Sequence, residues 1–215
     1  MSKHCCAAPA APAVQDPRYR RALWIALFIN AAMFAIELAG GAHAGSASLL
    51  ADAVDFFGDA SNYALSLAVL SMGALWRSRA ALVKGLCMGA FGIFVLGRSA
   101  WSVVAGVVPE AATMGGIALL ALCANLAVAL LLYAYRSGDA NMRSVWLCTR
   151  NDSIGNLAVM LAALGVFGTG GGWPDWLVAA LMGGLALSAS WTVVRAARHE
   201  MHGIAAPAAH AKHTH

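Results

Sequence analysis

The chain has 215 residues, of which 60% are hydrophobic and only 11% are charged, and its mean hydropathy is +0.69. Soluble domains carry about 25% charged residues, so this composition excludes an ordinary soluble domain and indicates an integral membrane protein. The formal net charge of +4 does not indicate a nucleic-acid partner, because the basic residues gather at the ends of apolar stretches, where they set orientation in the bilayer.

Six apolar stretches are each long enough to cross a hydrocarbon core of about 30 Å. They predict an all-α membrane protein built as a bundle of six transmembrane helices in residues 22–194. A disordered tail (residues 1–21) is expected before it and a histidine-rich tail (residues 195–215) after it. The predicted spans are Ala22–Ala42, Ser46–Met72, Ala80–Val104, Thr113–Tyr135, Val145–Phe167 and Pro174–Val194.

The distribution of Lys and Arg predicts that both termini are cytoplasmic. Basic residues precede the first span, follow the sixth, and lie between spans two and three and spans four and five. The loops around His43, Glu110 and Gly170 contain none. The first span is too long, and its polar leader too extended, for a cleaved signal peptide. We expect a multi-pass protein of the bacterial inner membrane.

The N-terminal tail contains His4, Cys5 and Cys6, which could capture a soft metal ion or could form an untethered end with no function. The cysteines lie in this tail and in predicted spans, so a disulfide framework is not expected. Within the first span, Glu37 lies near the outer end, where it could line an exit pathway or simply reach interfacial water.

The second span begins with Ser46 or Ser48 as its N-cap and carries three acids, Asp52, Asp55 and Asp59. At about 100° per residue they share one helix face. A charged side chain in hydrocarbon costs roughly 2.5–3.5 kcal/mol, so this face requires a cation, water or other helices beside it. Asn62, one turn further, could hydrogen-bond the carboxylates or wet the path.

The third span opens with Lys84, which is expected to snorkel inward, and includes a small-residue pattern at Gly85 and Gly89 suited to close helix contact. A purely structural alternative is that Lys84, Arg98 or Arg150 neutralises the buried acids in ion pairs. Arg98 is the cation whose depth best suits Asp52.

The fifth span places Cys148, Asp152 and Asn156 at i, i+4 and i+8, on one strip. Asp59 lies about 20 Å from the cytoplasmic end of span two, and Asp152 about 14 Å from that of span five, at 1.5 Å per residue. Both depths are near mid-membrane, so the strips can meet. Asn156 could be a ligand or a helix–helix hydrogen-bonding group. The candidate ligands for one ion are Asp55, Asp59 and Asp152, with Cys148 or Asn156 as the fourth.

Two motifs resemble the cation diffusion facilitator family of metal/proton antiporters. They are Glu37-Leu-Ala-Gly-Gly followed by Gly45-Ser-Ala-Ser-Leu-Leu-Ala-Asp-Ala and Asp55-xxx-Asp59, and the fifth-span stretch Asp152-Ser-Ile-Gly-Asn156. The family pattern of His or Asp, three residues, then Asp falls on Asp55 and Asp59, and on Cys148 and Asp152. The resemblance implies a tetrahedral divalent-metal site, alternating access, homodimerisation and exchange against protons.

Two departures from the family pattern affect this expectation. Cys148 stands where the family has His or Asp; its thiolate would suit Zn²⁺ or Cd²⁺, whereas three carboxylates alone would suit a harder ion. The family's C-terminal soluble domain is not expected in residues 195–215. His210, His213 and His215 in that tail could replace part of its metal capture, or could belong to a solvated end.

The sequence thus predicts divalent cation efflux, of Zn²⁺ or a related ion such as Cd²⁺ or Co²⁺, in exchange for protons. The partners are the metal, protons, the lipid bilayer and a second copy of the chain, and no prosthetic group is expected. Asp52 is expected to relay protons or to interact with the side chains that bind the metal without binding it itself. Two alternatives remain: a transporter of another cation, or a non-transporting membrane subunit or metal-sensing partner. An enzyme is not indicated, because no nucleophile–base pair or phosphate loop is visible.

Overall fold

The computed structural model describes residues 17–68, 74–135 and 140–210, apart from the side chains of residues 74, 77, 140–151 and 203–210. The described part is all helical and contains no strand. Its helices are α1 (Pro17–Ala44), α2 (Ala47–Ala68), α3 (Ala74–Ala105), α4 (Ala111–Tyr133), α5 (Ala140–Thr169) and α6 (Trp173–His210).

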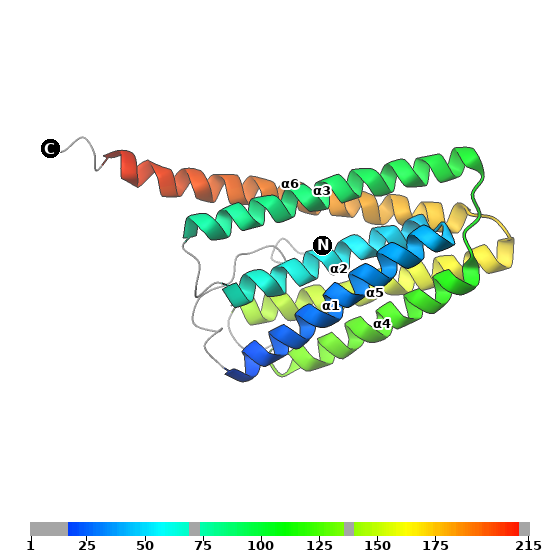
Figure 1. The fold of residues 1–215 in the computed structure, drawn as a ribbon, viewed down its shortest axis with the longest axis horizontal. Coiled ribbons are helices and arrows are strands. Elements are labelled where there is room, and N and C mark those ends of the chain that lie inside the picture. The colour runs from blue at the N-terminus through cyan, green and yellow to red at the C-terminus, as the bar shows by residue number, and fades with distance from the viewer. Residues whose placement is uncertain (1–16, 69–73, 136–139, 211–215) are drawn as a thin grey trace.

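The helices run lengthwise beside one another, and successive helices run in opposite directions (Figure 1). α3 and α6 form one closely packed pair, while α1 packs on α2 and α4 packs on α5. We call the end with the α1–α2, α3–α4 and α5–α6 connections the hairpin end. The opposite end, from which α1 starts and towards which α6 runs, is the terminal end.

Three glycines turn the chain at the hairpin end. Gly45, Gly106 and Gly170 follow α1, α3 and α5, and each has a φ between 63° and 69°. Residues other than glycine rarely adopt this left-handed backbone conformation. Helices commonly end at a glycine in this conformation. These positions therefore end the odd-numbered helices and let the next helix return alongside.

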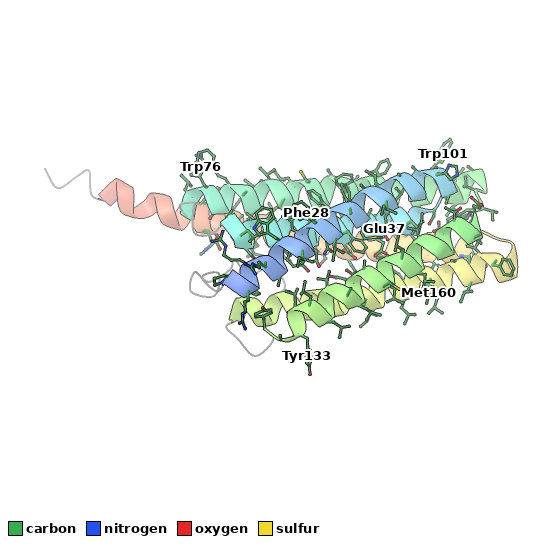
Figure 2. All side chains as sticks on the ribbon, turned by 60° about the horizontal axis from the view of Figure 1, so that its bottom comes forward. Phe28, Glu37, Trp76, Trp101, Tyr133 and Met160 are labelled. Atoms are coloured by element: carbon green, nitrogen blue, oxygen red, sulfur yellow. The ribbon has the colours of Figure 1, made fainter. Side chains whose placement is uncertain are left out.

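The outer surface of the bundle matches a lipid environment. Five described helices are long and apolar enough to cross a membrane: α1, α3, α4, α5 from Asp152 and α6 to His202. Trp76 and Trp101 are exposed at opposite ends of α3 (Figure 2). They are 25 residues apart, which corresponds to about 37 Å, a spacing that fits the aromatic belts at the two membrane surfaces.

α2 differs from these five helices because its acids lower its hydropathy, yet it lies inside the bundle. It contacts α1, α3, α5 and α6, and most of its residues are buried. The packing therefore shields α2 from lipid on several sides, so its three aspartates face protein.

Small residues bring α3 and α6 close together, as the glycine pattern predicted. A Cβ atom at Gly89 would lie 2.6 Å from Ser190 Oγ, and one at Gly85 would lie 2.9 Å from Val194. Ser190 Oγ also donates a hydrogen bond of 2.7 Å to the Gly85 carbonyl. A side chain at either position would therefore require the neighbouring residues of α6 to shift.

Asp175, at the start of α6, joins that helix to the start of α2. Its carboxylate accepts hydrogen bonds from Ser46 Oγ (2.7 Å), Ser48 Oγ (2.6 Å), and the backbone N–H groups of Ala47 (2.9 Å) and Ser48 (3.0 Å). Ser46 Oγ accepts from Leu49 N, so it is the predicted N-cap. A buried anion at this end also interacts favourably with the helix dipole of α2.

The helices are longer than the sequence predicted at four places. α1 begins at Pro17 and not at residue 22, α3 at residue 74 and not at 80, α5 at residue 140 and not at 145, and α6 continues from residue 194 to 210. Proline is well suited to the first helical position. Ser78 Oγ donates to Glu200 (2.9 Å), so the extensions of α3 and α6 support each other. The expected tails 1–21 and 195–215 are thus partly helical.

Candidate cation site

The three aspartates of α2 lie inside the bundle, as their common face predicted. Asp52 and Asp59 are buried, with 1% and 7% of their surface exposed, and Asp55 is half-buried. Asp52 and Asp59 are seven residues apart, which corresponds to about 10 Å along the helix. Together with Glu37 and Asp152, the three aspartates form what we call the acidic row.

Asp59 of α2 and Asp152 of α5 form the central pair of this row. Their carboxyl groups interact directly with each other. Tyr63 donates a hydrogen bond of 3.1 Å to Asp59 Oδ2. Asp152 Oδ2 is buried and has no hydrogen-bond partner among the described residues. Two ionised carboxylates repel each other strongly in a low-dielectric interior, so this pair requires a proton or a cation.

Asp55 lies between the central pair and the rest of the row. It is an electrostatic neighbour of Asp52, Asp59 and Asp152. Gly155 lies where α5 passes these acids: a Cβ atom there would be 3.9 Å from Asp52 Oδ1 and 4.0 Å from Asp55 Oδ2. The missing side chain therefore leaves the carboxylates room against α5.

Glu37 of α1 and Asp52 form a second pair, nearer the hairpin end, which we call the hairpin-side pair. Their side chains interact with each other, and Asp55 is also a neighbour of Glu37. Glu37 is completely buried within the bundle (Figure 2). Its buried position excludes the alternative in which Glu37 reaches interfacial water.

Lys84 of α3 brings a positive charge to the opposite end of the row. It is buried, with 7% of its surface exposed, and donates a hydrogen bond to Asn62 Oδ1. It is also an electrostatic neighbour of Asp59. Asn62 thus accepts a hydrogen bond from a cation, and no hydrogen bond from it to the carboxylates, one of its two predicted roles, is found among the described residues. The proposed pairing of Arg98 with Asp52 is not observed: Asp52 interacts with Glu37.

Asn156 lies one turn beyond Asp152 on α5 and is fully buried. Neither its Oδ1 nor its Nδ2 has a hydrogen-bond partner among the described residues. The helix–helix hydrogen bond considered for Asn156 is therefore not found in that part of the chain. Its amide oxygen is a donor atom that a cation could use.

The arrangement does not yet form a closed metal site. Among residues whose placement is described, no three His, Cys, Asp or Glu side chains are grouped so that they could hold a metal ion. Cys148 lies on α5, but its side chain is outside the described set. The row therefore offers carboxylate pairs, which chemically suit protons and hard or borderline divalent cations.

A family profile described as a cation efflux transmembrane domain matches residues 23–201. The chain belongs to this cation efflux family. The resemblance to cation diffusion facilitators is thereby confirmed. The match runs from the start of α1 well into α6 and so includes the whole acidic row.

Two curated relatives in the family carry the same efflux description. They are the metal cation efflux system protein CzcD of Cupriavidus metallidurans and the cation efflux system protein CzcD of an Alcaligenes species. Each is 24% identical in an alignment of length 187 that covers 81% of this chain and 59% of the relative. The chain thus spans about three fifths of the length of these relatives.

Family membership and the five apolar helices identify the chain as an integral, multi-pass membrane protein of the bacterial inner membrane. The predicted tail ligands cannot be placed beside the acidic row. His4, Cys5, Cys6, His213 and His215 lie outside the described residues, as does the side chain of His210.

Sequence reasoning missed two residues that contact the site. Tyr63 stands one helical turn after Asp59, so its i, i+4 spacing could have revealed the hydrogen bond. Gly155 lies within the motif quoted for the family resemblance, but its role became visible only from the distances to α2. The proximity of Lys84 to Asp59 depends on how α3 crosses α2, which no spacing within one helix encodes.

Proposed function

We propose that this protein exports divalent metal cations from the cytoplasm in exchange for protons. The observation that carries the proposal is the central pair, in which buried carboxyl groups from α2 and α5 interact directly. Such a pair needs positive charge between its members, and a metal ion and protons are alternative ways to supply it. Membership in the cation efflux family supports the same activity.

The proposed cycle uses the acidic row as a place where metal and protons compete. A metal ion enters from the cytoplasm, displaces protons from Asp55, Asp59 and Asp152, and is held between α2 and α5. The bundle then opens to the other side, protons return to the carboxylates, and the ion leaves. In this proposal α2 also crosses the membrane, which brings the number of spans to six. Both termini are cytoplasmic, and the working unit is a homodimer.

The proposed substrate class is Zn²⁺ or a related ion such as Cd²⁺ or Co²⁺. A site with three carboxylates and the Cys148 thiolate would suit these ions. Competition binding with Zn²⁺, Cd²⁺, Co²⁺ and Mn²⁺ tests this assignment. We expect Cys148→Ser to weaken binding of Zn²⁺ and Cd²⁺ and to spare Mn²⁺. An unchanged profile would remove the thiol from the ligand set and favour Asn156.

The test of transport is metal flux in proteoliposomes with an imposed proton gradient. We expect wild-type protein to move Zn²⁺ with counter-movement of protons, and Asp59→Asn and Asp152→Asn to abolish this movement. Glu110→Gln is the matched control, because Glu110 is exposed at the hairpin end and its side chain accepts a hydrogen bond from Thr113 in the first turn of α4. Absence of metal flux by folded wild-type protein would contradict the proposal.

Lys84 gives a specific reason to retain a non-transporting subunit as the second candidate. A buried lysine beside Asp59 could satisfy that acid permanently as part of the fold. In that case Lys84→Met would unfold the protein, and the wild type would bind no metal at the central pair. Under the transport proposal, Lys84→Met stays folded and binds metal more tightly.

A further inference from the structure

We infer that the hairpin-side pair, Glu37 and Asp52, is a second binding site for a divalent cation, separate from the central pair. The inference rests on the proposed function, because the ion that it binds is the transported one. The second site lies about 10 Å along α2 from Asp59, towards the hairpin end.

The first support is the environment of Glu37. It is fully buried, and neither Oε1 nor Oε2 has a hydrogen-bond partner among the described residues. A buried carboxylate without donors is costly, so such groups normally have a counter-charge or a donor aimed at them. The side chain that faces Glu37 is Asp52, another acid. In the part of the chain that the structure describes, two acids thus lie against each other without a hydrogen-bond donor for Glu37.

The second support is the matching state of Asp52. It is 1% exposed, and its Oδ2 is also without a hydrogen-bond partner in the described part of the chain. Three buried carboxylate oxygens from α1 and α2 therefore lack a donor at one place. Hard and borderline divalent cations are bound by oxygen atoms of this kind, and one such ion carries the charge that balances both acids.

The third support is continuity with the central pair. Asp55 is an electrostatic neighbour of Glu37 and Asp52 on one side, and of Asp59 and Asp152 on the other. Gly155 leaves space for Asp52 and Asp55 against α5. Asp55 therefore lies between the two pairs, and an ion that moves from one pair to the other passes this carboxylate.

Counting bound ions on the purified full-length protein tests the inference. The probe is Zn²⁺ alone, measured by equilibrium dialysis in detergent, and the same tails are present in every variant. We expect Glu37→Gln and Asp52→Asn each to bind one Zn²⁺ fewer per chain than the wild type. Glu37→Asp, which keeps a carboxylate, should bind as many Zn²⁺ ions as the wild type. We expect Asp59→Asn to lose a different ion, so that Glu37→Gln combined with Asp59→Asn binds two fewer.

Two results would overturn the second site. In one, folded Glu37→Gln and Asp52→Asn bind as many Zn²⁺ ions as the wild type, which would mean that the pair holds protons only. In the other, Glu37→Gln combined with Asp59→Asn loses no more ions than either variant alone, which would mean one shared site. Flux separates this from the proposed function: unchanged ion counts with normal Zn²⁺ transport would reject the second site and leave the transporter.

Discussion

At the scale of single residues, Lys84 places a positive charge beside Asp59, one of the proposed metal ligands. The lysine comes from α3, is buried, and is held by Asn62 while it lies near the central pair. A positive charge there repels an arriving cation. Under the proposed function, Lys84 is therefore expected to weaken metal binding and to assist release.

We expect Lys84→Met to raise the affinity for Zn²⁺ by about tenfold, or about 1.4 kcal/mol, because the repulsion is removed. Transport turnover should fall at the same time, since a tighter ion leaves more slowly. Isothermal titration and proteoliposome flux measure the two effects. Lys84→Arg keeps the charge and is the control; equal affinities for Lys84→Met and the wild type would show that the ammonium group does not act on the ion.

At the scale of helices, Gly155 marks a small space between α5 and the acids of α2. A Cβ atom at this position would make ordinary contacts, at 3.4 Å from Met182 and at 3.9–4.0 Å from the acids. Alanine should therefore be accommodated, whereas a branched side chain would place methyl groups among the carboxylates.

We expect Gly155→Ala to fold and to transport metal at close to the wild-type rate. Gly155→Val should fold but lose metal binding by about tenfold or more, because overpacking here displaces Asp52 or Asp55. Zn²⁺ affinity and flux, measured on both variants, check the prediction. Equal loss in the alanine and valine variants would indicate a general helix defect and not a filled space beside the acids.

The joint between α6 and α2 is also an element-scale feature, because one carboxylate bonds to four donors of another helix. Asp175→Ala would leave these buried donors without their acceptor. We expect a loss of about 2–3 kcal/mol in stability, measured by thermal unfolding in detergent. Asp175→Asn, which keeps one acceptor oxygen, should lose less; an unchanged melting temperature for Asp175→Ala would refute a stabilising role.

At the scale of the whole molecule, the proposed topology places the hairpin end outside the cytoplasm. Single cysteines introduced into a cysteine-free background can report this by labelling with an impermeant reagent in intact cells. We expect a cysteine at Glu110 to be labelled, and one at His199 to be labelled only after the membrane is broken. The reverse pattern would invert the bundle and make the proposed flux an import.

Much of this molecule could be predicted from its sequence, because both the lipid-facing spans and the buried acids follow helical periodicity. The common face of Asp52, Asp55 and Asp59 and the approach of Asp152 followed from spacing and depth. Lys84 was one of three cations considered as partners of the acids, but its place beside Asp59, and the contact of Glu37 with Asp52, could not be chosen from spacing, because each depends on how two helices cross. The helical residues before residue 22 and after residue 194 were missed, because hydropathy marks the membrane boundary and not the helix end.

The central claim is that α2 and α5 hold one ion between them, and a double-mutant cycle on Zn²⁺ affinity tests it most directly. The Kd is measured for wild type, Asp59→Asn, Asp152→Asn and the double variant. If both carboxylates bind the same ion, the second substitution costs little once the first is made, with a coupling free energy of about 1–3 kcal/mol. Losses that simply add would show that the two helices do not share an ion.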